Sequence, residues 1–218
     1  MSVSGETPAL RVLPRGRHAA AREVVAESQR ERMLVAMAES CAAKGYANVA
    51  VADVIERAHV SRRSFYEHFS NKEDCFLAAY DAGVEGLLDE IGHAEEAARP
   101  RGGLLASARA GTETYLQLLA DNPAFARTFL IEVLGAGPDA LTRRDAVHQR
   151  FADRLAEGFE AVRGDAPAPA PFVFRAAVGA IHELVTQKLI SDGPEALPDL
   201  LDQVLEVELR LLGAPAPR

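Results

Sequence analysis

The sequence lacks the features that mark a membrane or secreted protein. It has no tryptophan and only two cysteines, Cys41 and Cys75, which are too few for a disulfide framework and suit a reducing compartment. No run of about 18 uncharged apolar residues is present, so no transmembrane span is expected. The N-terminus becomes basic without an apolar stretch, which argues against a secretory signal. These absences predict a cytoplasmic protein without a membrane partner.

Motifs that carry catalysis or metal binding are also missing from the sequence. We find no nucleophile elbow, no glycine-rich phosphate loop, no HExxH motif and no paired catalytic carboxylates. Neither cysteine belongs to a CxxC pair, and His93, His148 and His182 lack the spacing of a metal site. The sequence therefore predicts no metal, no cofactor and no enzymatic activity, with a small helical enzyme as the least favoured alternative.

The charge is distributed unevenly along the 218 residues. The total of 24 basic and 32 acidic side chains gives a net charge of -8, which alone argues against a nucleic-acid partner. Residues 1–80, however, contain 11 basic and 10 acidic residues, whereas residues 81–218 contain 13 and 22. Residues 8–22 carry four arginines and no acidic residue. A basic arm before an acidic body is typical of a chain whose N-terminal end meets a polyanion, although a solvated leader without a partner remains an alternative.

Apolar periodicity is helical almost throughout, so we predict an all-α fold of about nine helices. A capping box at Ser28–Glu31 is expected to begin the first helix, which Gly45 ends. A second capping box is expected at Ser70–Glu73, before a helix that continues through Ile91. Residues 99–103 are expected to break the chain, and residues 166–171, which alternate alanine and proline, to form an extended connector. Further helices are predicted over residues 104–120, 124–134, 139–163, 172–191 and 196–212.

Two short helices from Val51 to Phe69 have the dimensions of a helix-turn-helix. Ser61 is placed to cap the second of them, and Phe65 and Phe69, one turn apart, are expected to anchor it to the core. The N-terminal half of this helix would then face outward, as in recognition helices that read the major groove.

The run Gly45-Tyr46-x-x-Val49-Ala50-Val51-Ala52-Asp53-Val54-Ile55, followed by residues 58–69 (AHVSRRSFYEHF) and by Asn71-Lys72-Glu73, resembles the DNA-binding domain of TetR-family transcriptional regulators. The resemblance covers residues 28–80. It implies an all-helical homodimer with three N-terminal DNA-binding helices and a C-terminal effector-binding and dimerisation domain. The corresponding parts here are an arm over residues 1–26, a DNA-binding domain over 27–80 with its motif at about 50–69, and a body over 81–218.

Candidate DNA contacts follow from the motif and the basic arm. They are Ser61, Arg62, Arg63, Ser64, Tyr66, His68 and Lys72, with Arg15 and Arg17 in the arm. Two departures from the family pattern affect this region. Val49 and Ala50 stand where the family usually has a hydroxyl residue, and His59 stands at the turn glycine. Double-stranded DNA with a palindromic sequence is the partner that the resemblance implies.

The body carries no family signature, so its roles depend on the resemblance. The helices at 172–191 and 196–212 are expected to form the homodimer interface. Candidate residues for an effector pocket are Tyr115, Phe125, Phe129, Phe151, Phe159 and His182, although aromatic residues at helical spacing more often pack in the core than contact a ligand. The resemblance favours a repressor released by a small molecule. A constitutive DNA-binding dimer whose body is a protein-interaction module stays open as the alternative.

Overall fold

The computed structural model describes residues 18–160 and 168–211, and every regular element in these ranges is helical. The α-helices are α1 (His18–Lys44), α2 (Val51–Ala58), α3 (Arg62–His68), α4 (Lys72–Asp121), α5 (Pro123–Leu130), α6 (Pro138–Glu160), α7 (Pro171–Asp192) and α8 (Leu201–Leu211). Short 3-10 helices are η1 (Tyr46–Asn48), η2 (Glu132–Gly135) and η3 (Pro194–Leu200). The all-α prediction is confirmed, and because α4 is kinked, the eight α-helices provide nine straight segments in the described ranges.

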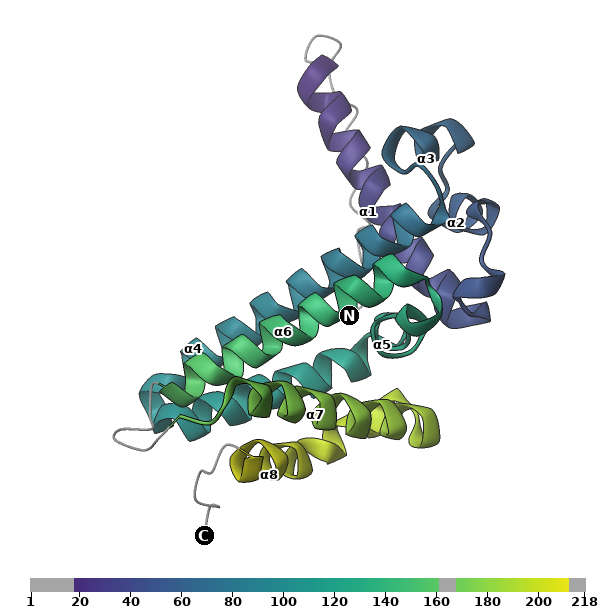
Figure 1. The fold of residues 1–218 in the computed structure, drawn as a ribbon. Helices are drawn as coiled ribbons and strands as arrows, with labels where there is room; N and C mark the ends of the chain where they lie inside the picture. The colour runs from purple at the N-terminus through teal and green to yellow at the C-terminus, as the bar shows by residue number, and fades with distance from the viewer. Residues whose placement is uncertain (1–17, 161–167, 212–218) are drawn as a thin grey trace, which may run out of the picture.

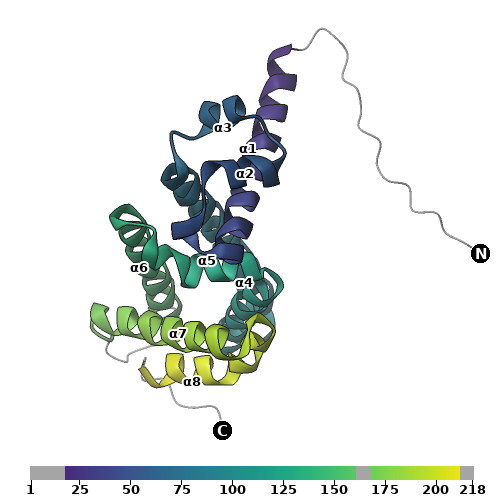
Figure 2. The same ribbon diagram turned by 90° about the vertical axis from the view of Figure 1, so that its right-hand side faces the viewer.

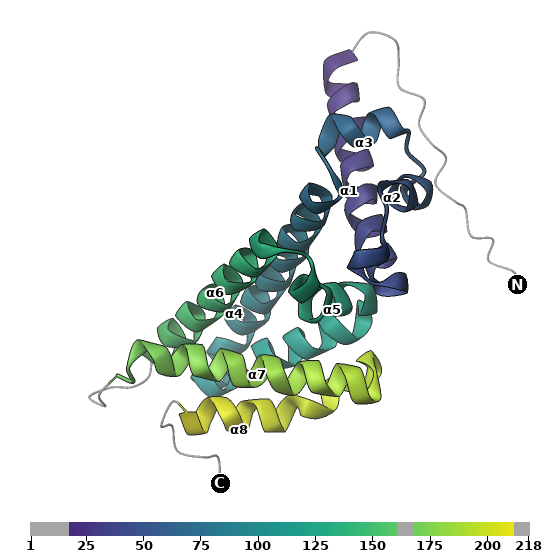
Figure 3. The same cartoon turned by 45° about the vertical axis from the view of Figure 1, so that its right-hand side comes forward.

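Helices α1–α3 form one end of the molecule, and α4 leads from them into a body made of α5–α8 (Figure 1). Helix α6 lies along α4, whereas α7 and α8 lie side by side at the end opposite α3 (Figure 3). A continuous core joins both parts, from Met33 and Phe65 at the α1–α3 end through Tyr80 to Leu130 and Val185 in the body. The α1–α3 end is therefore fixed to the body through packed side chains as well as through the backbone of α4.

The first helix begins earlier than the sequence predicts. Helix α1 begins at His18, so Ser28 and Glu31 lie inside it and form no capping box. Residues 18–27 contain four alanines among mostly good helix formers, so the helix extends back through them. The predicted arm over residues 1–26 is consequently helical from His18 onward, and its remainder lies outside the described residues.

The start of α4 also differs from the prediction by one residue. Asn71, not Ser70, is the N-cap, and its side chain accepts a hydrogen bond from the Asp74 backbone N–H at 2.9 Å. The Asp74 carboxylate accepts in turn from the Ser70 N–H at 2.8 Å. Asparagine and serine cap equally well, so a sequence with both side by side does not reveal which of them starts the helix.

The predicted break at residues 99–103 is a kink within α4. Gly102 and Gly103 leave helical backbone angles, with Gly103 at φ 64°, and Pro100 precedes them. The predicted single helix over 196–212 is divided, because Pro198 falls within it and η3 occupies residues up to Leu200 before α8 begins. Residues 168–170 of the predicted connector are non-helical, and residues 161–167 lie outside the described part of the chain.

Candidate nucleic-acid interface and internal cavity

Local hydrogen bonds set the geometry of the α2–turn–α3 segment. His59 ends α2 in the left-handed region (φ 52°, ψ 48°), which is the conformation that a turn glycine would supply. The Ser61 hydroxyl caps α3 by accepting from the Ser64 backbone N–H at 3.0 Å. Arg32 of α1 donates to the Ala58 carbonyl at 3.1 Å and so holds the end of α2 against α1. The turn is therefore fixed from both sides.

The first turn of α2 replaces the missing hydroxyl cap with a carboxylate. Val49 is buried in the core, and Ala50 is the N-cap residue without a side-chain hydrogen bond of its own. The Ala50 N–H donates instead to the Asp53 carboxylate at 2.6 Å, and Lys44 pairs with the same carboxylate at 2.5 Å. The Lys44 hydrogen bond, followed by the Ala50 N–H, lowers the pKa of Asp53. The first turn of α2 is thus held by the paired Asp53 carboxylate, while the N-cap residue Ala50 contributes no side-chain hydrogen bond.

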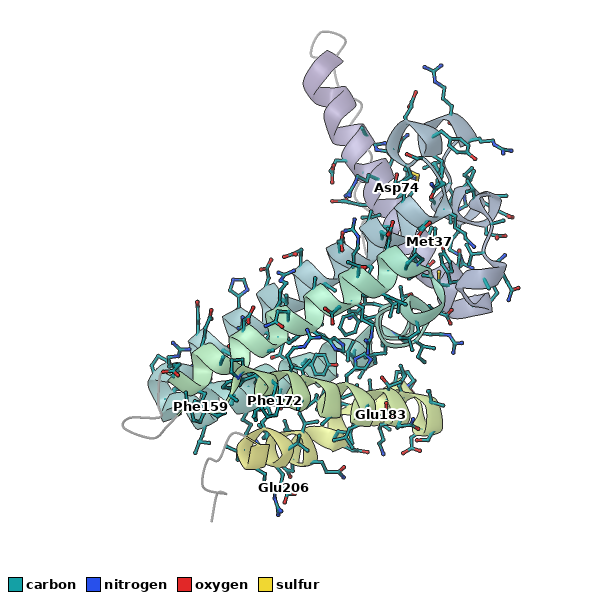
Figure 4. All side chains as sticks on the ribbon, in the orientation of Figure 1. Met37, Asp74, Phe159, Phe172, Glu183 and Glu206 are labelled. Carbon is teal, nitrogen blue, oxygen red and sulfur yellow. The ribbon has the colours of Figure 1, made fainter. Side chains whose placement is uncertain are left out.

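Helix α3 is anchored by buried aromatic rings and exposes its basic face. Phe65 is fully buried and Phe69 nearly so, with ring centroids 5.6 Å apart. Arg63 is 89 % exposed and donates to Glu67 at 2.9 Å. The Arg62 guanidinium lies over the ring of Tyr66, which is itself 48 % exposed. The long side chains of α3 project from the end of the molecule that is farthest from the body (Figure 4).

The remaining residues predicted for this surface are partly occupied within the domain. Ser61 and Ser64 share a hydroxyl hydrogen bond at 3.1 Å, and His68 is half-buried beside Phe69. The Lys72 ammonium donates to the Tyr46 carbonyl at 3.0 Å and lies 4.1 Å from the centre of the Tyr46 ring. Arg15 and Arg17 lie outside the described residues. The structure thus brings Arg62, Arg63 and Tyr66 together on one exposed face, while Lys72 holds Tyr46.

A cavity of about 40 Å³ that is partly open to solvent lies in the body, between α4, α5, α6 and α7. It is lined by Tyr115, Phe129, His148, Phe151, Val178, Ile181 and His182. Four of these were predicted from the sequence, whereas His148, Val178 and Ile181 were missed. These three residues lie on the inward faces of α6 and α7, and helical spacing in the sequence does not distinguish a residue that lines a cavity from one that packs in the core.

Two aromatic residues predicted for the pocket do not line this cavity. Phe125 stacks on Phe129 with ring centroids 5.5 Å apart and fills the space beside Gly83, where an added Cβ would lie 2.2 Å from the ring. Phe159 packs against Phe174 at the far end of α6, in a small separate cluster. Both residues support the walls of the body and are core residues in this structure.

The two histidines of the cavity contact each other and are held neutral. His148 and His182 are both buried, and their ring centroids lie 4.7 Å apart. Burial lowers the pKa of each to about 4, and the charge of Arg144 lowers both further. The His148 Nε2 atom has no hydrogen-bond partner. The cavity therefore offers an aromatic wall and an unpaired polar atom.

The α5–η2 segment connects this cavity with the α1–α3 end. Phe129 lines the cavity, and the neighbouring Thr128 hydroxyl donates to the Ala38 carbonyl of α1 at 3.4 Å. Glu132 accepts from the Tyr46 backbone N–H at 2.7 Å and from Arg127 at 3.0 Å. Figure 2 shows α5 between α1 and α7. A shift of α5 at the cavity would therefore move the groups that bond to η1 and α1.

Comparison with known proteins identifies the N-terminal region and the fold. Residues 34–79 match the family model of bacterial regulatory proteins, tetR family. Within residues 18–160 and 168–211 no helix has the length and apolarity needed to cross a membrane. No functionally curated protein matches the sequence.

Solved structures resemble this chain over most of its length at low identity. A fatty acid degradation regulator FadR from Bacillus halodurans has a TM-score of 0.72 at 18% identity, with 87% of this chain and 97% of that chain covered. The transcriptional regulator FadR from Bacillus subtilis, in complex with stearoyl-CoA, has a TM-score of 0.70 at 19% identity, with 85% and 99% covered. A TetR-family transcriptional regulator from Streptomyces coelicolor has a TM-score of 0.67 at 20% identity, with 90% and 97% covered. Residues 34–79 therefore match a tetR-family domain, and the chain as a whole has the fold of the solved TetR-family transcriptional regulators.

Proposed function

We propose that this protein is a cytoplasmic, sequence-specific DNA-binding transcription regulator without enzymatic activity. The observation that carries the proposal is the face of α3, where Arg62, Arg63 and Tyr66 are exposed on a helix held by buried Phe65 and Phe69. Arginine at the N-terminal half of such a helix pairs in bidentate fashion with guanine in the major groove. Tyr66 can contact phosphate or a thymine methyl group, and the backbone amides at the start of α4 suit a phosphate.

The regulator acts as a homodimer through α7 and α8 in this proposal. Phe172 is 73% exposed and Ile190 is 62% exposed, and both lie on α7. They are 18 residues apart, which is five helical turns, so they share one face. Between them on that face lie Ala176 and Gly179, whose small size permits close approach of a second helix. Two α3 helices in a dimer would meet half-sites of a palindrome about 34–36 Å apart.

Repression relieved by an effector is the mode that the cavity favours. A ligand that enters between α5, α6 and α7 acts on Phe129, and through Thr128 and Glu132 on the α1–α3 end. Phe129 also stacks on Tyr80, with ring centroids 5.7 Å apart, in the segment of α4 that begins directly after α3. The similar FadR structure holds stearoyl-CoA, a ligand with a long apolar chain, and an apolar effector suits the aromatic wall here. The alternative, a body that only dimerises or binds another protein, leaves the unpaired His148 without a role.

DNA retardation tests the function. Purified protein is mixed at low salt with the DNA upstream of its own gene and with sites selected from a random library. We expect Arg63→Ala to weaken binding to the selected site by about tenfold to a hundredfold, because a bidentate arginine–guanine pair contributes about 1–3 kcal/mol. Arg109→Ala is the control, since Arg109 is an exposed arginine of the body paired with Asp202. Absence of retardation by the unaltered protein, or equal binding by both variants, would contradict the proposal.

A further inference from the structure

Unpaired buried polar atoms gather between α6, α7 and α4 beside the internal cavity. Among the described residues, they include Arg144 Nε and His148 Nε2 on α6, Thr186 Oγ1 on α7 and Tyr80 Oη on α4. A buried polar atom without a partner costs about 1–3 kcal/mol, so native structures keep few of them. Four in one region indicate that a ligand supplies the missing partners.

Of these four residues only His148 lines the cavity, and helix geometry places Arg144 and Thr186 next to it, beyond one end of the cavity. Helices α6 and α7 are antiparallel, since Phe159 contacts Phe174 and His148 contacts His182. Arg144 lies one turn before His148 on α6, and Thr186 lies one turn after His182 on α7, so both belong to the same level of the helix pair. Phe151 and Val178 lie on the opposite side of the histidine pair and line the apolar part of the cavity.

Arg144 supplies the positive charge at this end of the cavity. It is half-buried and has no ion-pair partner among the described residues, unlike Arg143, Arg150 and Arg154 on the same helix, which pair with Asp81, Glu85 and Glu95. Its charge lowers the pKa of both histidines and of Tyr80, so the guanidinium is within electrostatic reach of all three. Asp145 and Arg175 also act on His148, but they pair with each other, so Arg144 is the cation near the histidines that has no ion-pair partner among the described residues.

We propose that the cavity binds a small monocarboxylic acid, with its carboxylate against Arg144, His148 and Thr186 and its apolar body between Tyr115, Phe129 and Phe151. This inference rests on the proposed effector-responsive function and names the chemical class of the effector. A guanidinium pairs with a carboxylate through two parallel hydrogen bonds, and one cation matches one negative charge.

The size of the cavity makes binding a conformational event. A volume of about 40 Å³ holds a few water-sized groups. An acid with six or more apolar atoms must therefore displace Phe129 or Phe151 and separate α5 or α6 from α7. The ligand would then bind the displaced arrangement of helices more tightly than the undisplaced one, and this difference in affinity shifts the equilibrium between the two arrangements.

Isothermal titration calorimetry on the full chain tests the proposal with matched probes. Octanoate and phenylacetate are compared with octanamide and phenylacetamide, which have the same apolar bodies and no charge. We expect the acids to bind at least about tenfold more tightly than the amides, since hydrogen bonds to charged groups are worth about 1.5–3 kcal/mol. Arg144→Gln should remove this preference, and Arg144→Lys should retain part of it. Arg150→Gln, which removes an exposed arginine paired with Glu85 on the same helix, should leave it unchanged.

Several outcomes would overturn the proposal. They are equal binding of acid and amide, an unchanged preference in Arg144→Gln, and binding by none of the four probes. DNA retardation is measured in parallel on the same samples. Failure of the unaltered protein to bind DNA would contradict the proposed function and leave the calorimetric result standing, so the two failures are distinguishable.

Discussion

At the scale of single residues, the neutral histidine pair makes the body sensitive to acid. His148 and His182 face Arg144, Asp145 and Arg175 on α6 and α7, and Glu183 acts on His182. Both pKa values fall from 6.5 to about 4 in the folded protein, chiefly through burial. The unfolded chain therefore binds more protons than the folded chain between these values. Stability is fully present above about pH 6.5 and is lost as the pH falls toward 4.

We predict that His148→Gln flattens this dependence. For each buried histidine, the free energy of unfolding should fall by about 1–2 kcal/mol between pH 7 and pH 5. Urea unfolding of the unaltered protein and of His148→Gln at both pH values measures the difference. The exposed His93 on α4 gives the control variant His93→Gln, which should follow the unaltered protein. An identical decrease in all three proteins would show that the histidine pair does not carry the pH dependence.

At the scale of elements, the η1–η2 contact is a polar connection between the two parts of the molecule, in addition to the Thr128–Ala38 hydrogen bond. Glu132 is 11% exposed as a side chain and accepts from both the Tyr46 N–H and Arg127. Gly45, which precedes η1, supplies the positive φ of 77° that this turn requires. A backbone donor of one element thus depends on a carboxylate from an element 86 residues away in the sequence.

We predict that Glu132→Ala loosens η1 more than it destabilises the body. Its removal leaves the half-buried Tyr46 N–H without an acceptor, which costs about 1–3 kcal/mol. Hydrogen exchange should be faster at residues 44–48 and nearly unchanged in α7. Glu132→Gln, which retains an acceptor oxygen, should lie between this variant and the unaltered protein. Unchanged exchange at Tyr46 in Glu132→Ala would mean that packing alone holds the contact.

Elements defined by local chemistry were the ones that the sequence predicted best. The Ser61 cap, the turn at His59 and the burial of Phe65 and Phe69 depend on neighbours within a few residues, and all four are confirmed. Errors arose where two nearby residues could play the same part, as with Ser70 and Asn71, or where helix propensity continued past a residue able to act as a cap, as at Ser28.

The cavity depends instead on packing between distant segments. Tyr115 and His182 were predicted on their residue type, but His148, Val178 and Ile181 become cavity residues only because α6 lies antiparallel to α7. Phe125 and Phe159 have the same type and spacing as Phe129 and Phe151, yet the helix arrangement buries them elsewhere. Helical periodicity identifies the inward face of each helix and not the neighbour that this face meets.

At the scale of the whole molecule, the exposed arginines of α3 and the exposed apolar side chains of α7 lie at opposite ends. The acidic surplus belongs to residues 81–218, whereas the exposed arginines of α3 lie at the other end of the chain's fold (Figure 1). The exposed apolar side chains of α7 lie at the end that is farthest from α3, where Figure 4 labels Phe172. With this arrangement the acidic body lies away from a polyanion bound at α3, and the exposed apolar face of α7 is left for a partner.

We predict that Phe172→Glu and Ile190→Glu, singly or together, convert a dimer into monomers. Each places a charge on an apolar face that a second copy of the chain would bury, and an unpaired buried charge costs several kcal/mol. Analytical ultracentrifugation over a concentration series measures the monomer–dimer equilibrium, and circular dichroism verifies that the helices remain. Leu141→Glu, a substitution at an exposed leucine of α6, is the control that should stay dimeric. Because a palindrome needs two α3 helices, the monomeric variants should also lose retardation of the selected site. A monomeric unaltered protein, or dimers that persist in both α7 variants, would move the interface away from this face.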